Sequence, residues 1–165
     1  MAFLLRTVTN PKWVKSDWMQ PGDVPADALS DLRATDNKLS VWSVQSDAAN
    51  LDVVLTALAA HRERLDKIDY TLIDDSILPP IPIDSVRSDA NTPYVSANPA
   101  HMDLIQLSVN KIARLAHVMM PLHRIRVSEK QVKKLLMDAL RNGYLDRDRI
   151  KPDLLSELEP APNQA

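Results

Sequence analysis

Three short segments in the first half of the chain carry the apolar patterns that are typical of β-strands: residues 3–8, 38–44 and 68–73. In the second segment, polar and apolar residues alternate with a period of two. Leu39 and Val41 fall on one face, and Trp42 and Val44 on the other. Neither face is fully polar, so we expect this strand to be central in its sheet.

Helical patterns separate these three strands. A short helix is predicted from Pro25, with Ala28, Leu29 and Leu32 on one side. A second is predicted from a cap at Ser46 to about residue 65, with apolar residues at the spacing of a buried stripe. Residues 1–78 therefore predict a small three-stranded sheet with two helices.

Residues 79–99 contain five prolines together with Ser, Asp and Asn, which predicts a proline-rich connector without regular structure. Such a length of irregular chain is uncommon inside a compact domain. We expect it to be a flexible joint or a segment that wraps the surface or a partner.

A helical part is predicted over residues 100–158. From about Pro99 to Met120, apolar residues cover more than one face of the expected helix, which indicates a central helix or half of an oligomer interface. Ser128 and Gln131 form a capping-box pattern, and Asn142-Gly143 ends that helix. Pro152 begins a last short helix to Leu158.

The predicted fold class is therefore α+β: a small three-stranded sheet with two helices, followed by a three-helix C-terminal part. Residues 159–165 are expected to be a frayed tail. The length of 165 residues favours one compact domain overall.

Composition excludes several familiar active sites. The chain has two glycines, Gly22 and Gly143, and they are far apart. A phosphate-binding GxxxxGK[ST] loop, a GxGxxG dinucleotide turn and a GxSxG nucleophile elbow each need closely spaced glycines. The absence of cysteine excludes disulfides, thiolate zinc sites and cysteine nucleophiles. No two of the four histidines stand at i, i+4, so we predict no metal site and no cofactor.

The chain shows no signal-peptide pattern and no apolar run long enough to span a membrane, which favours a cytoplasmic location without membrane contact. Charge is uneven. Residues 1–80 have 8 basic and 12 acidic side chains, a net charge of −4, whereas residues 81–165 have 12 and 10, a net charge of +2.

The basic excess of the second half centres on residues 111–141. On the predicted helix from residue 128, Lys130, Lys134 and Arg141 share the polar face. This surface predicts a contact with an acidic protein or, less strongly, a nucleic-acid-binding module, because base-reading side chains are scarce near it.

An enzyme is the other alternative. Arg6 on the first strand and Ser40 on the second resemble the Arg and Ser/Thr strand positions of ADP-ribosyltransferases. The catalytic Glu of that family has no counterpart, since the third strand ends in Asp74-Asp75 and Glu63 lies on a predicted helix. Arg6, Ser40 and Asp74 are the candidate pocket residues of this hypothesis.

Trp13 and Trp18 lie in one predicted loop. Large aromatic side chains in a loop either fold back on the core or contact a partner. Together with the apolar segment at 100–120 and the lack of a catalytic pattern, they favour a non-catalytic interaction or regulatory subunit. A protein partner or a homo-oligomer is expected.

Overall fold

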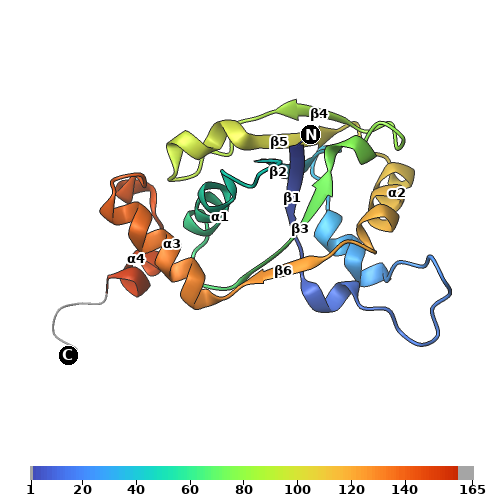
Figure 1. The fold of residues 1–165 in the computed structure, drawn as a ribbon, viewed down its shortest axis with the longest axis horizontal. Coiled ribbons are helices and arrows are strands. Elements are labelled where there is room, and N and C mark those ends of the chain that lie inside the picture. Colours follow the sequence, from blue (N-terminus) through green and yellow to red (C-terminus); the bar gives the residue numbers. More distant parts are fainter. Residues whose placement is uncertain (1, 160–165) are drawn as a thin grey trace.

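A six-stranded antiparallel sheet forms the centre of the protein (Figure 1), in the strand order β4-β5-β2-β1-β3-β6. The structure, a computed structural model, describes residues 2–159. The strands are β1 (Ala2–Thr7), β2 (Leu39–Gln45), β3 (Ile68–Asp74), β4 (Asp84–Arg87), β5 (His101–Ile105) and β6 (Arg124–Val127). The α-helices within the described residues are α1 (Leu51–Ala60), α2 (Val109–Met119), α3 (Glu129–Arg141) and α4 (Pro152–Leu158).

Short 3-10 helices connect several of these elements. They are η1 (Asn10–Trp13), η2 (Ala26–Leu32), η3 (Asp75–Ile77), η4 (Val95–Ala100) and η5 (Arg147–Arg149). The short helix predicted from Pro25 is η2, a 3-10 helix rather than an α-helix.

The two faces of the sheet carry separate cores. One face packs against α1, α3, α4 and η4, and its core includes Leu5, Tyr70 and Leu136. The other packs against η1, η2, α2 and the segment before β4, and its core includes Trp13 and Leu115. Alternation along β1 explains the division, because Leu5 points to the first face and Leu4 to the second.

The prediction of a three-stranded sheet followed by three helices is wrong, although the α+β class is correct. Strands β1, β2 and β3 lie at the predicted segments, and β2 and β1 are central. Three further strands are present: β4 lies in the predicted connector, β5 in a segment predicted to be helical, and β6 in the link between two predicted helices.

The helix expected over 100–120 is instead strand β5 followed by helix α2. Gln106 between them has φ +54°, a left-handed conformation that interrupts any helix at this point. Ser108 then caps α2 by accepting a hydrogen bond from the Lys111 amide. Most of the apolar side chains that suggested an oligomer interface pack in the protein's own core. The buried ones are Leu104, Leu107, Leu115, Ala116 and Met119.

The connector predicted at 79–99 is not without regular structure, because it contains β4 and η4. Asn98 holds its C-terminal part together by accepting hydrogen bonds from the amide and hydroxyl of Thr92. Of the predicted tail, only Glu159 lies within the described residues, where it pairs with Arg147.

Helix α3 follows its prediction closely. Ser128 accepts from the Gln131 amide, and the Gln131 side chain accepts from the Ser128 amide, which completes the capping box. Val132, Leu136 and Ala139 are buried on one face. Among the residues the structure describes, no helix is long and apolar enough to cross a lipid bilayer.

Candidate functional site

The segment between β1 and η2 presents one tryptophan to the core and another to solvent. Trp13, at the end of η1, is 1% exposed, whereas Trp18 in the following loop is 77% exposed. Val14 in the same loop is 66% exposed. We call residues 14–25 the Trp18 loop. In Figure 1 this loop, drawn in blue, projects away from the sheet.

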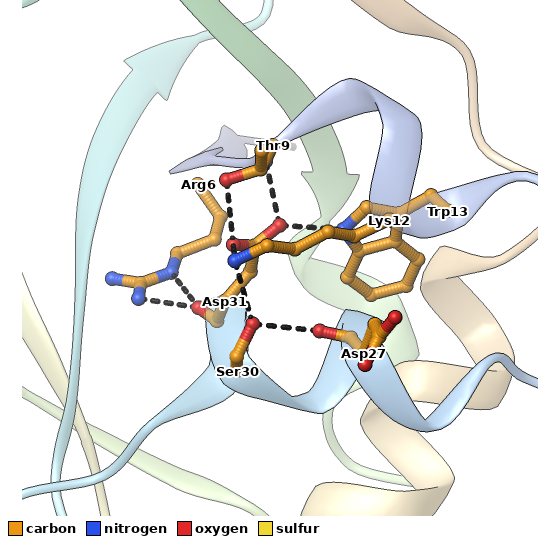
Figure 2. A network of polar contacts seen from close by, with 7 residues as sticks. All are labelled: Arg6, Thr9, Lys12, Trp13, Asp27, Ser30 and Asp31. Atoms are coloured by element: carbon orange, nitrogen blue, oxygen red, sulfur yellow. Dashed lines mark hydrogen bonds and ion pairs between the residues drawn. The ribbon is translucent and has the colours of Figure 1, made fainter.

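Asp31 fixes the base of the Trp18 loop. Its carboxylate accepts hydrogen bonds from the Thr9 amide at 2.6 Å, the Thr9 hydroxyl at 2.9 Å and the indole Nε1 of Trp13 at 2.8 Å. Lys12 completes the surroundings with its Nζ 3.6 Å from the same carboxylate. Figure 2 shows these groups, which all precede the Trp18 loop, converging on Asp31, which follows it.

Arg6 ties the same network to the sheet. Its guanidinium donates to the Asp31 carbonyl from Nε at 3.0 Å and from Nη2 at 2.5 Å, and to the Ser40 carbonyl from Nη1 at 2.7 Å. Burial lowers the pKa of Arg6, and the nearby Asp31 charge partly opposes this effect. Because its described partners are backbone carbonyls, Arg6 joins β1, β2 and η2.

Three further contacts support the base of the loop. The guanidinium of Arg124 lies over the Trp13 ring, 5.4 Å from its centroid. The Lys12 ammonium donates to the Ser30 hydroxyl, which in turn donates to the Asp27 carbonyl. These contacts come from β6, η1 and η2, so several elements hold the base of the loop in place.

The loop itself is shaped by short turns. The Met19 amide donates to the Ser16 carbonyl at 3.0 Å, and the Asp23 amide donates to the Gln20 carbonyl at 3.1 Å. Gly22 adopts φ +91°, which a residue with a side chain rarely does. The Gly22 carbonyl lies 3.1 Å from Nδ1 of His117, which links the end of the loop to α2.

The three residues of the enzyme hypothesis do not line one pocket. Phe3 pairs with Asp74, and Arg6 lies three residues farther along β1, so Arg6 and Asp74 point to opposite faces of the sheet. Ser40 lies on the same face of the sheet as Asp74. However, the β2 residue level with Asp74 is Val44, because both pair with Phe3 on β1. Ser40 is therefore displaced along β2 by roughly 13 Å at about 3.3 Å per residue.

Ser40 belongs to a different group of polar residues. Its hydroxyl donates to the Asp103 carboxylate at 3.2 Å. It also lines a hollow of about 320 Å³ with His61, Asp89 and His101. Burial lowers the pKa of His101, whose Nδ1 lies 2.8 Å from the Ser88 hydroxyl. Within residues 2–159, no three His, Asp or Glu side chains are grouped closely enough to hold a metal ion.

The basic residues predicted on α3 lie on its exposed face. Lys130, Lys134 and Arg141 are exposed, and Arg141 lies 3.8 Å from Asp138. Lys133, between them, instead donates to the Glu157 carbonyl at 2.8 Å and so joins α3 to α4.

Sequence reasoning missed the residue that organises the loop. Nothing in the sequence near Asp31 indicates its role, apart from its place near the end of a short helix. The residues that donate to its carboxylate lie 18 to 22 positions earlier in the chain. The sequence places both tryptophans in one predicted loop, and nothing local distinguishes a buried indole from an exposed one. In comparisons with known proteins, no family model, no curated protein and no solved structure matches this chain.

Proposed function

We propose that this protein is a non-catalytic, cytoplasmic interaction subunit and that Trp18 is its principal contact with a partner protein. The observation that carries the proposal is an indole that is 77% exposed at a loop whose base is fixed by the Asp31 network. Tryptophan is enriched among the residues that dominate binding energy in protein interfaces.

A fixed base matters for affinity. Binding a flexible loop costs conformational entropy, and that cost falls when the loop is already held in the bound shape. Turns at Ser16–Met19 and Gln20–Asp23 and the His117 contact at Gly22 provide such order in the Trp18 loop. The exposed Val14 supplies further apolar surface in the same loop.

The catalytic alternative lacks support in the geometry. Arg6 is engaged with backbone carbonyls, and Asp74 lies on the other face of the sheet. The basic face of α3, with Lys130, Lys134 and Arg141, remains a predicted second contact for an acidic partner. An interaction role uses both surfaces and requires no enclosed pocket.

Comparative affinity purification tests the proposal. The tagged full chain, Trp18→Ala and the control Val109→Ala are each incubated with lysate, and the retained proteins are measured by quantitative mass spectrometry. Val109 is 82% exposed, so its variant controls for the general loss of exposed apolar surface. We expect a defined partner that is retained by the original chain and by Val109→Ala and is lost with Trp18→Ala.

The decisive measurement is the Kd of each variant for that purified partner. Removal of a dominant interface tryptophan costs roughly 2 kcal/mol or more, which corresponds to a Kd about 30-fold higher. The proposal is wrong if Trp18→Ala leaves both the set of retained proteins and the Kd unchanged.

A further inference from the structure

Strand β4 is an edge strand that no other element covers within residues 2–159. All four of its residues, Asp84 to Arg87, are exposed, so neither of its faces packs on a helix. Its one neighbour in the sheet is β5. The opposite edge strand, β6, differs: Arg126 pairs with Asp69 there, and Ile125 and Val127 pack against the core.

Both ends of β4 are nevertheless fixed. Ile83, immediately before the strand, is 5% exposed in the core. Ser88, immediately after it, donates its amide to the His101 carbonyl at 3.2 Å, and its hydroxyl lies 2.8 Å from Nδ1 of His101. The buried Ile83 on one side and the hydrogen bonds of Ser88 to His101 on the other therefore hold four solvent-exposed residues in an extended conformation.

The same contact at Ser88 shows which backbone groups of β4 are unpaired. In an antiparallel pair, residues that bond to the neighbouring strand alternate with residues that direct their amide and carbonyl away from it. Since Ser88 bonds to His101 on β5, Val86 and Asp84 also direct their backbone toward β5. Ser85 and Arg87 then direct theirs toward the free edge of the sheet.

The surface beside β4 is hollowed in two places. A hollow of about 810 Å³ is lined by Ser85 and Arg87 together with Ser43 and Asp75. A second, of about 510 Å³, is lined by Arg87 with Val95 and Pro99. Arg87 borders both hollows. The first extends inward over the sheet to Ser43 on β2, so it leaves the side chain of Arg87 uncovered without forming a groove outside the edge.

We infer that the free edge of β4 binds an extended segment of a partner protein as a seventh, antiparallel strand. The unpaired amides and carbonyls of Ser85 and Arg87 are complementary to a backbone in the same extended form. The exposed side chains of β4 determine which residue types the bound segment should contain. Asp84 and Arg87 have no ion-pair partner within the described chain, and Val86 is 42% exposed.

Charge complementarity gives the order of the bound residues. Opposite charges stabilise a cross-strand pair and like charges destabilise it. An acidic residue therefore lies opposite Arg87, an apolar β-branched residue opposite Val86, and a basic residue opposite Asp84. Read along an antiparallel partner, the preferred order is acidic, apolar, small polar, basic.

A second copy of this chain fits the edge less well. Antiparallel pairing of two β4 strands through their outward backbone groups places Ser85 opposite Arg87 of the other copy. The two Arg87 side chains are then diagonal neighbours on the same face of the sheet, where long cationic side chains repel each other. The edge therefore favours a heterologous segment over self-association.

The test uses the full chain and two labelled ten-residue peptides with the same composition. One has Glu-Val-Thr-Lys at its centre, and the other has Lys-Val-Thr-Glu. Fluorescence anisotropy measures each Kd, and nuclear magnetic resonance measures amide exchange. We expect the first peptide to bind at least tenfold more tightly and to slow exchange at Ser85 and Arg87.

Two substitutions separate binding from folding. Ser85→Pro removes an amide that faces the free edge, which an edge strand tolerates, and we expect it to weaken peptide binding at least tenfold without changing the melting temperature. Trp18→Ala is expected to leave peptide binding unchanged, so this test and that of the Trp18 loop are independent. Equal binding of both peptides, binding unaffected by Ser85→Pro, or a dimer of the unliganded chain in light scattering would overturn the inference.

Discussion

Trp13 and Trp18 are five residues apart and have the same side chain, yet they lie in opposite environments. The indole of Trp13 is buried, donates to Asp31 and lies under the guanidinium of Arg124. The indole of Trp18 is 77% exposed, and no hydrogen bond to another described residue involves its ring. The comparison shows that the first belongs to the fold, whereas the second is available to a partner.

The largest expected difference between the two is in stability. Trp13→Ala removes a buried aromatic side chain and leaves a cavity, so we expect the free energy of unfolding to fall by about 3–5 kcal/mol. Trp18→Ala should change it by no more than about 0.5 kcal/mol, the usual range for surface positions. Urea denaturation monitored by circular dichroism measures both. Similar losses in the two variants would contradict the distinction.

Asp31 tests whether the base of the loop is a single network. Asp31→Ala leaves the Thr9 amide and the Trp13 indole N–H without their acceptor, which should cost roughly 1–3 kcal/mol. Asp27→Ala is the matched control, because Asp27 contributes its backbone carbonyl rather than its carboxylate to the network. We expect the control to remain within about 0.5 kcal/mol of the original chain. Equal effects of the two changes in urea denaturation would show that Asp31 does not organise the base.

The base of the Trp18 loop also shows which contacts cannot be predicted from the sequence. Repeating patterns predicted β1, β2, β3 and the capped helix α3, since their signals lie within a few neighbouring residues. Strand β6 also has an alternating pattern, Arg124-Ile125-Arg126-Val127, but it spans four residues between two predicted helices. The role of Asp31 was beyond such reasoning, because its acceptor oxygens and their donors are brought together by tertiary structure.

The candidate site was predicted only in part for a related reason. Trp18 and the exposed basic residues of α3 are where the sequence led us to expect surface side chains. The sequence predicts the same role for Trp13, which is buried, and the predicted pocket of Arg6, Ser40 and Asp74 rests on strand positions without the register. Register decides which face of a sheet a residue occupies, and here it separates Arg6 from Asp74.

Acid should weaken the sheet beside the base of the loop. Arg126 donates two hydrogen bonds to the buried Asp69 carboxylate and holds its pKa below the ordinary value of 3.8. A carboxyl with a depressed folded-state pKa stabilises the protein above its unfolded pKa, and that stabilisation is lost as the pH falls through the folded value. We therefore expect unfolding to become easier below about pH 4.

Asp69→Asn identifies the contribution of this pair. The slope of stability against pH below pH 4 should become shallower in the variant, by about 1 kcal/mol over the transition because Arg126 is half-exposed. Some slope should remain, since hydrogen bonds also lower the pKa of Asp74 and Glu159. Urea denaturation at several pH values provides the measurement, and an unchanged slope would exclude Asp69 as a source of acid sensitivity.

The smallest effect is expected at the far end of the loop. His117→Ala removes the contact with the Gly22 carbonyl and should lower stability by about 0.5 kcal/mol, because the contact is exposed. The loop itself should become easier to cleave by trypsin after Lys15. His123→Ala, which changes another exposed histidine, serves as the control. Cleavage at the same rate in all three proteins would show that His117 does not restrain the loop.

Quenching of tryptophan fluorescence by acrylamide tests the central claim most directly, because it measures how accessible each indole is. The original chain is compared with Trp18→Phe, alone and in complex with the partner retained by affinity purification. We predict that the free chain has an easily quenched component that disappears in Trp18→Phe and becomes protected in the complex, while Trp13 and Trp42 resist quenching throughout. The account is contradicted if Trp18 is already protected in the free chain or stays fully accessible when the partner is bound.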